Sequence, residues 1–199
     1  LCRRHGEKLF LKGDRCFTPK CSFDRRPNPP GPRPARRRKV SDRGLQLREK
    51  QRARVAYGVL EKQFVRYYKE AIRRPGVSGE NLVRLLETRL DNIVYRLGFA
   101  DSRSQARPLV RHGIIAVNGR KLDVPSAHLK EGDVVSFTAR GLRSEYYKIV
   151  QDGIKSKNSP SWLTLDAAGM TGRVAGVPTV AQGETHLFNE NVIIEYYSR

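Results

Sequence analysis

The sequence contains no long hydrophobic run. No apolar stretch approaches the ~18 residues that a membrane-spanning helix needs, and no segment combines the basic, apolar and small-residue parts of a signal peptide. We therefore expect a cytosolic protein without a membrane partner.

Signatures of catalysis are missing as well. The chain has no Walker A loop, no His-Glu-x-x-His motif, no Gly-x-Ser-x-Gly elbow and no glycine pattern for dinucleotide binding. We predict that the protein is not an enzyme.

Acidic residues are scarce relative to basic ones. Only 20 Asp and Glu stand against 39 Lys and Arg, which gives a formal charge of +19 and a pI near 10.4. Residues 1–74 hold 23 basic and 7 acidic residues, whereas residues 126–199 hold 8 of each. Because such a field attracts polyanions and releases their counterions on binding, we expect a nucleic-acid partner along the N-terminal third.

The first half of the chain predicts an arm followed by helices. Residues 25–39 contain five prolines and seven basic residues, which favours an extended arm that becomes ordered on its partner. Apolar residues at steps of three and four then predict helices over 42–56 and 60–73, whose cations form a broad positive face. A further apolar stripe from Leu82 to Leu97 predicts a helix that ends at Gly98.

The middle of the chain predicts a small unit of helix and sheet. Ser102 and Gln105 have the spacing of a capping box, and Pro108 should kink or shorten the helix that they begin. The pair Asn118-Gly119 between two β-rich runs predicts a hairpin.

The remaining elements are predicted from shorter patterns. We expect a strand over Val134–Phe137, a helix near 144–155, and a closing strand over Val192–Tyr197. An apolar final strand must pack somewhere, so the tail should return to an earlier domain.

Residues 89–137 carry an ordered series of motifs. They are R-L-D-N-x-V-Y-R-L-G from Arg89, S-R-x-Q-A-R-x-L-V from Ser102 and H-G-x-I-x-V-N-G from His112, followed by Pro-Ser and Gly-Asp turns. This segment resembles the RNA-binding module that is named after small-subunit ribosomal protein S-four. The resemblance by itself implies RNA binding, since the module also occurs in RNA-modifying and stress proteins.

The segments on either side of this module narrow the resemblance to one family. L-R-E-K-Q from Leu47, Y-G-V from Tyr57, E-K-Q-F from Glu61, P-S-W-L from Pro160 and the closing E-Y-Y-S-R are similar to the bacterial S-four family of small-subunit ribosomal proteins. Nearly the whole chain is covered. Pro108 and Ile114 depart from the residues usual in the family, at positions that bear on local RNA contacts.

The family resemblance implies a set of partners. It implies primary binding to a multi-helix junction in the 5′ domain of sixteen-S rRNA, which nucleates assembly of the small subunit. It also implies a place beside ribosomal protein S-five and other small-subunit proteins, near the channel through which mRNA enters, with an influence on translational accuracy. Some members of the family also repress translation of their own operon.

The predicted fold class is α+β. We expect a basic, zinc-binding arm over residues 1–41 and a helical rRNA-binding domain over 42–87. A module of two helices and a small antiparallel sheet, of the S-four type, should cover 88–150. Residues 151–199 should form a C-terminal segment that returns to pack on the helical domain.

Three cysteines lie within the first 21 residues, in a basic stretch where disulfides are disfavoured. Cys2, Cys16 and Cys21 therefore predict a tetrahedral zinc site, which would supply folding energy that this terminus lacks. In the family a fourth cysteine stands three positions before Cys2, and here that position would precede Leu1. The fourth ligand is thus either an upstream cysteine or His5, and three unliganded thiols are the remaining alternative.

Candidate RNA contacts are chosen for their charge and hydrogen-bonding capacity. Arginine grips phosphate oxygens through its planar fork, while His and Asn can reach sugars and base edges. In the N-terminal part the candidates are Arg3, Arg4, Arg36, Arg37, Arg38, Arg48, Lys50, Arg52 and Arg54. In the module they are Arg103, Arg107, Arg111, His112, Asn118 and Lys121.

Other functional classes fit the chain less well. A ribosome-associated stress factor or an RNA-modification factor with the same module is the main alternative. A modifying enzyme would need a catalytic domain of roughly 150 residues, for which too little chain is left. A DNA-binding transcription factor would need a longer recognition helix than the one that begins at Ser102.

Overall fold

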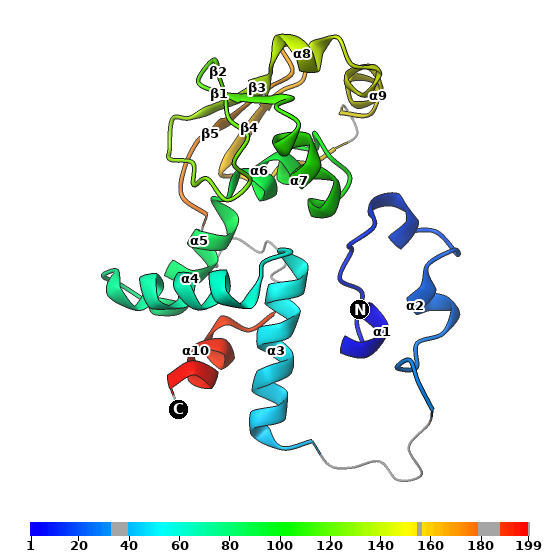
Figure 1. The fold of residues 1–199 in the computed structure, drawn as a ribbon, viewed down its shortest axis with the longest axis vertical. Coiled ribbons are helices and arrows are strands. Elements are labelled where there is room, and N and C mark those ends of the chain that lie inside the picture. The colour runs from blue at the N-terminus through cyan, green and yellow to red at the C-terminus, as the bar shows by residue number, and fades with distance from the viewer. Residues whose placement is uncertain (33–39, 155–156, 179–187, 199) are drawn as a thin grey trace. The chain divides into compact units, whose positions relative to one another are not determined.

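The structure is a computed structural model that describes residues 1–32, 40–154, 157–178 and 188–198. Its contacts divide the chain into two compact units (Figure 1). The helical unit comprises Leu1–Leu82 and Thr185–Arg199, and the mixed unit comprises Val83–Glu184. The α+β class, the helical N-terminal domain and the small antiparallel sheet are thereby confirmed. None of the helices in the described ranges has the length and apolar character that a bilayer crossing requires.

The helical unit is built from short helices at the N-terminus and longer ones after residue 40. Its elements are α1 (Cys2–His5), a 3-10 helix (Gly13–Cys16), α2 (Ser22–Arg25), α3 (Asp42–Ala56), α4 (Glu61–Arg73), the start of α5 (Ser78–Glu87) and α10 (Glu190–Ser198). The two helices predicted over 42–56 and 60–73 are confirmed. Ser41 caps α3, since its hydroxyl accepts a 3.2 Å hydrogen bond from the Gly44 backbone N–H.

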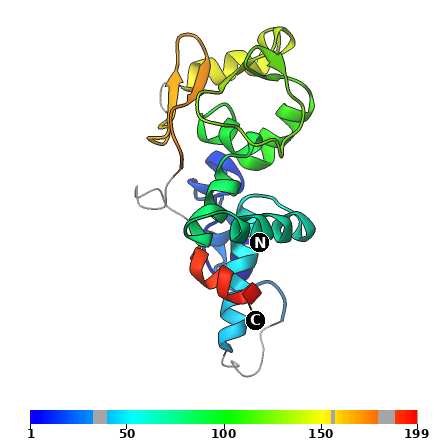
Figure 2. The ribbon, with the colours of Figure 1, turned by 90° about the vertical axis from the view of Figure 1, so that its left-hand side faces the viewer.

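The closing segment is a helix, so the predicted strand over Val192–Tyr197 is wrong. Its N-terminus is capped by Asn189, whose Oδ1 accepts from the backbone N–H groups of Asn191 and Val192. Tyr197 then packs on Tyr68 of α4, Ile193 four residues earlier is fully buried, and the helix as a whole contacts α3. The described part of the helical unit offers no strand with which a β-segment could pair. Figure 2 shows α10 beside α3 from the side.

The mixed unit packs helices against one sheet. The helices are α6 (Leu90–Arg96), α7 (Arg103–Arg111), α8 (Ala139–Leu142) and α9 (Glu145–Gly153). The strands are β1 (Ile115–Val117), β2 (Arg120–Lys121), β3 (Val134–Phe137), β4 (Leu163–Asp166) and β5 (Thr171–Val174), in the order β2-β1-β3-β5-β4 and antiparallel throughout. Residues from α6, α7 and the sheet share a single apolar core.

The predicted hairpin is confirmed in detail. Asn118 and Gly119 have positive φ angles of 50° and 75°, as a type I′ turn requires. The turn pairs Val117 with Arg120. The predicted strand over Val134–Phe137 is β3, which pairs with β1.

The C-terminal segment does not act as one piece. We expected all of residues 151–199 to pack on the helical domain, but β4 and β5 extend the sheet of the mixed unit. Gly172 of β5 lies so close to α6 that a Cβ there would be 2.3 Å from Leu97 Cδ1. Among the segment's described residues, α10 packs on α3, and the Asn189 N–H just before it bonds to Glu49 of α3 at 3.1 Å.

The predicted single helix through Leu82–Leu97 is also wrong, because it breaks between α5 and α6. Arg89 adopts an extended backbone with ψ of 139°, and Leu90 N–H bonds to the Ala127 carbonyl at 2.8 Å. The backbone around Arg89 thus pairs across to residues 127–129 in place of the helical ladder.

Pro108 does not shorten α7, contrary to that part of our expectation. The helix continues to Arg111, and the His112 N–H bonds to the Pro108 carbonyl at 2.8 Å. Proline removes one ladder bond, but the burial of Leu109 and Val110 holds the last turn in place. The predicted cap is confirmed, since Ser102 Oγ accepts from Gln105 N–H.

Candidate nucleic-acid interface

The exposed side of α7 carries a row of arginines. Arg103, Arg107 and Arg111 follow one another at four-residue steps and therefore lie on one side of the helix. Arg107 and Arg111 are exposed, and Arg107 Nη1 is 3.6 Å from the Asp91 carboxylate. Arg103 is more restrained, because its Nε donates a 2.7 Å hydrogen bond to Asn92 Oδ1 and its guanidinium lies 4.7 Å from the Tyr95 ring centroid.

The end of α7 meets the hairpin. His112 is exposed and follows the last residue of α7, and Gly113 next to it has a φ of 70°. A Cβ at Gly113 would be 2.7 Å from Lys121 Cε, so the lysine side chain packs directly on this glycine. The structure thus brings Lys121 to the end of the arginine row. Exposed Arg120 precedes it on β2 and was missed by the sequence analysis, although its place in the predicted hairpin was a usable signal.

The side chain of Asn118 forms hydrogen bonds within the protein. Its Nδ2 donates to Asp133 Oδ1 at 2.8 Å, and its Oδ1 accepts from the Val134 N–H at 2.9 Å. These bonds tie the hairpin turn to β3. The side chain thus braces the loop beside the cationic surface.

Buried charges behind α7 hold the arginine row in position. Glu87 is 1 % exposed and accepts from Asn92 Nδ2 at 2.7 Å and from Arg96 at 2.7 and 3.1 Å. With its amide N–H group directed to Glu87, Asn92 presents Oδ1 to Arg103. Part of the R-L-D-N-x-V-Y-R-L-G motif therefore orients α7.

Most of the basic side chains predicted on α3 form hydrogen bonds or ion pairs within the helical unit. Lys50 is 5 % exposed, bonds to Glu61 Oε1 at 2.7 Å and lies 5.1 Å from the Tyr196 ring centroid. Arg54 donates to Gln51 at 2.9 Å. Of the α3 candidates, Arg48 is exposed and has no ion pair among the described residues.

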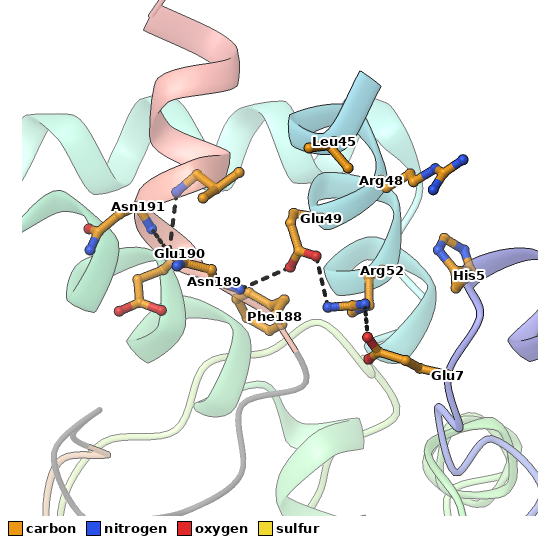
Figure 3. A pocket seen from close by; sticks show the side chains of 11 residues that line it. His5, Glu7, Leu45, Arg48, Glu49, Arg52, Phe188, Asn189, Glu190 and Asn191 are labelled. Carbon is orange, nitrogen blue, oxygen red and sulfur yellow. Dashed lines mark hydrogen bonds and ion pairs between the residues drawn. The ribbon is translucent and has the colours of Figure 1, made fainter. Parts of the chain in front are cut away.

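A pocket of 930 Å³ opens beside α3 (Figure 3). Arg52 lies in it between two carboxylates, with Nη1 2.8 Å from Glu49 and Nη2 bonded to Glu7. Burial, together with the charge of Arg52, lowers the pKa of His5 in the same pocket below 6.5. Since the lining carries both signs of charge, the pocket is not a strong anion site.

The arm residues are only partly described. Arg3 Nε donates to the Asn28 carbonyl at 2.8 Å, and Arg4 is exposed. The predicted contacts Arg36, Arg37 and Arg38 lie outside the described residues.

The cysteines are not gathered into a metal site. Cys16 and Cys21 are buried, and Cys16 Sγ accepts a 3.4 Å hydrogen bond from the Lys12 N–H. Cys2 is half-buried, and His5 lines the pocket beside Arg52. Among the described residues no group of three or more His, Cys, Asp or Glu is close enough to hold a metal ion. The geometry therefore lends no support to the predicted zinc ligands as a set.

Comparison with known proteins covers the whole chain. Residues 1–87 match the family described as "Ribosomal protein S4/S9 N-terminal domain", and residues 88–135 match the "S4 domain". The chain is 50 % identical over 199 residues to the small ribosomal subunit protein uS4 of Heliobacterium modesticaldum and 52 % identical to that of Maridesulfovibrio salexigens. In both comparisons all of this chain aligns with 95 % of the relative. The uS4 of Dictyoglomus thermophilum is 52 % identical over 202 residues.

Proposed function

Since this chain belongs to the family of the small ribosomal subunit protein uS4, we propose that it binds ribosomal RNA through α7 and the adjoining hairpin. It is a structural protein of the small ribosomal subunit and not an enzyme. The family resemblance drawn from the motifs is confirmed. The alternative of a stress or RNA-modification factor gains no support from the full-length matches.

The observation that carries the proposal is the row of exposed cations along α7. Arg107 and Arg111 continue into His112 and Lys121, so one surface offers several donors to consecutive phosphates. Phosphate contacts of this kind position RNA-binding proteins, and donors of the His type can also reach the 2′-hydroxyl.

The test is a matched pair of charge-removing variants. R107Q/R111Q should weaken binding to the 5′ domain of sixteen-S rRNA and lower the salt dependence by about 0.7 per lost contact. R140Q/R143Q, which removes two exposed cations from the α8 region, is the control and should bind nearly as the parent does. Equal losses in the two variants would contradict the assignment of α7.

We further propose the finer roles that the family resemblance implies. The chain would bind a junction in the 5′ domain of sixteen-S rRNA early in assembly, contact ribosomal protein S-five, lie near incoming mRNA and influence accuracy. The strong positive charge of residues 1–74 supports early RNA binding. In reconstitution without the protein, assembly of the small subunit should stall, and adding the protein late should restore assembly slowly. Normal assembly in its absence would rule out the nucleating role.

Zinc in the N-terminal arm stays a separate proposal. Its support is the spacing of Cys2, Cys16 and Cys21 and the burial of the last two thiols, not an assembled ligand cluster. When bound, zinc would tie the arm together through thiolates. Metal analysis of the purified protein should find one zinc per chain, lost in C16S/C21S. A zinc-free protein with the same arm mobility by NMR as the variant would remove the proposal.

A further inference from the structure

Both ends of the chain reach α3 at neighbouring residues. Arg52 Nη2 donates to Oε1 of Glu7 in the N-terminal arm. One turn earlier on α3, Glu49 accepts a 3.1 Å hydrogen bond from the backbone N–H of Asn189, which directly precedes α10. Arg52 and Glu49 are themselves paired at 2.8 Å. Four groups from three parts of the chain are thus linked in one series, which can be followed along the dashed lines of Figure 3.

The two middle groups of this series have a fixed geometry. Arg52 uses Nη2 for Glu7 and Nη1 for Glu49, so one planar guanidinium serves both carboxylates. Glu49 uses Oε1 for Arg52 and Oε2 for Asn189, so each oxygen of its carboxylate has its own partner. The two side chains are only 16 % and 20 % exposed, which limits screening of the pair by solvent. Turning either planar group away from one partner therefore also moves it away from the other.

On the arm side, the series ends in a cross-linked segment. Lys8, which follows Glu7, donates to Asp24 Oδ2 at 2.7 Å and to the Cys16 carbonyl at 3.3 Å. These bonds join residues that are 16 and 8 positions apart in the sequence. The contact with Arg52 thus attaches a braced arm to α3.

On the tail side, the series ends at the residue that caps α10. Asn189 Oδ1 accepts from the backbone N–H groups of Asn191 and Val192 at 3.0 and 3.4 Å. The side chain of Asn189 therefore caps the helix while Glu49 holds its backbone. If the bond to Glu49 weakens, the capping residue is freed and the first turn of α10 frays.

We propose that Arg52 is a positioning residue that couples the N-terminal arm to the C-terminal helix. While Glu7 is docked, Arg52 is held against Glu49, and Glu49 is held against Asn189. When a partner draws the arm off α3, Arg52 regains its rotamer freedom and the start of α10 loosens. By linkage, a partner that stabilises α10 favours the docked arm by the same factor. This role differs from the RNA contact that the sequence predicted for Arg52, and it goes beyond the proposed function.

The arrangement of donors decides the sign of the coupling. If Glu7 and Glu49 competed for one donor, removing Glu7 would strengthen the pair of Arg52 with Glu49. Each carboxylate instead has its own guanidinium nitrogen, so the two bonds support each other by orienting the same plane. Loss of Glu7 should therefore weaken the hold of Glu49 on Asn189.

Amide hydrogen exchange of the full chain, followed by NMR, measures the coupling. E7A should speed exchange of the Asn189 and Asn191 amides about threefold, a size expected between neighbouring groups of a partly exposed network. E7Q keeps an acceptor oxygen and should fall between E7A and the parent. D14A is the matched control, because Asp14 is an exposed arm carboxylate without an ion pair among the described residues. It should leave both amides unchanged.

A double-mutant cycle separates this coupling from general loosening. E49A removes the link to the tail, so adding E7A to E49A should not speed exchange of the Asn189 amide further. R52K keeps the charge but lacks the planar fork, so E7A should have no effect in R52K either. Amides of β3 and β5 should exchange as in the parent throughout, because the mixed unit takes no part in the series.

The opposite results are equally clear. Slower exchange of Asn189 in E7A would overturn the proposal in favour of competition, and unchanged exchange would show that the arm and the tail are independent. A further increase when E7A is added to E49A would refute coupling through Glu49. RNA binding by R107Q/R111Q has no bearing on these outcomes, so this inference and the proposed function fail separately.

Discussion

Asn92 joins the polar groups that set the direction of α7. Its amide donates to Glu87 and accepts from Arg103, and the residue is 1 % exposed. Replacing Asn92 with alanine leaves the buried Glu87 carboxylate with one fewer hydrogen-bond donor. We expect N92A to destabilise the protein by about 2 kcal/mol, because buried hydrogen bonds to charged groups contribute roughly 1.5–3 kcal/mol.

The measurement is urea unfolding of N92A beside N158A, which alters an exposed asparagine of the same unit. An unchanged midpoint for N92A would show that this network does not hold α7. N92A removes the hydrogen-bond acceptor of Arg103, so it should also weaken RNA binding when Arg103 is present. In a protein that already carries R103A, adding N92A should not weaken RNA binding further.

Glu61 links α4 to the C-terminal helix and makes this contact dependent on pH. Burial pushes its pKa up, but the hydrogen bonds from Lys50 and Tyr197 prevail and the pKa is lowered below 4.5. A lowered folded-state pKa means that the unfolded chain takes up the proton more readily. The stabilisation is therefore present above pH 4.5 and is lost as the pH falls through the folded-state value.

An acid titration checks this. The parent should lose stability below about pH 4.5, and E61Q should be less stable at neutral pH and show a shallower acid loss. A parallel acid profile in both proteins would contradict the role of Glu61.

Lys50 and Arg48 illustrate why the role of a single residue is hard to predict from the sequence, since both are basic residues of α3. Tyr196 and Tyr197, which return from the far end of the chain, lie over the Lys50 ammonium group.

At the scale of elements, the close packing of β5 on α6 depends on one residue without a side chain. A Cβ at Gly172 would lie 2.3 to 2.9 Å from three atoms of Leu97, which is fully surrounded by the core. We expect G172A to cost about 1–3 kcal/mol, the usual range for overpacking a core.

Thermal unfolding of G172A is compared with that of G153A, where an added Cβ meets nothing within 4 Å. A melting temperature equal to that of the control would mean that Leu97 moves aside freely.

Local signals predicted the elements that local forces determine. The cap at Ser102, the turn at Asn118-Gly119 and the amphipathic pattern of α4 each act within a few residues. The apolar pattern did not indicate the helix break at Arg89, because the apolar residues on both sides of the break keep the same helical periodicity. The bonds that cause it come from residues 127–129. The tail was misread because β-branched residues favour strands, whereas a cap and the face of α3 stabilise a helix there.

At the scale of the whole molecule, net charge identified the partner class and left the binding surface open. Of the predicted RNA contacts, Arg107, Arg111, His112 and Lys121 are exposed on the mixed unit, where the ion pairs of Arg107 and Lys121 are long at 3.6 Å. Lys50, Arg52 and Arg54 are held more closely by acceptors within the helical unit. A sequence shows how many cations there are, but the pairing of each depends on where the few acidic residues fold.

We propose that the excess of cations is arranged to hold folded ribosomal RNA. The most direct measurement is the affinity of the full chain for the 5′ domain of sixteen-S rRNA at moderate salt, with duplex DNA of equal phosphate content as competitor. We expect tight binding that falls steeply with salt and that the DNA does not displace at equal phosphate. Binding that the DNA displaces as readily as the RNA itself, or no binding at all, would contradict it.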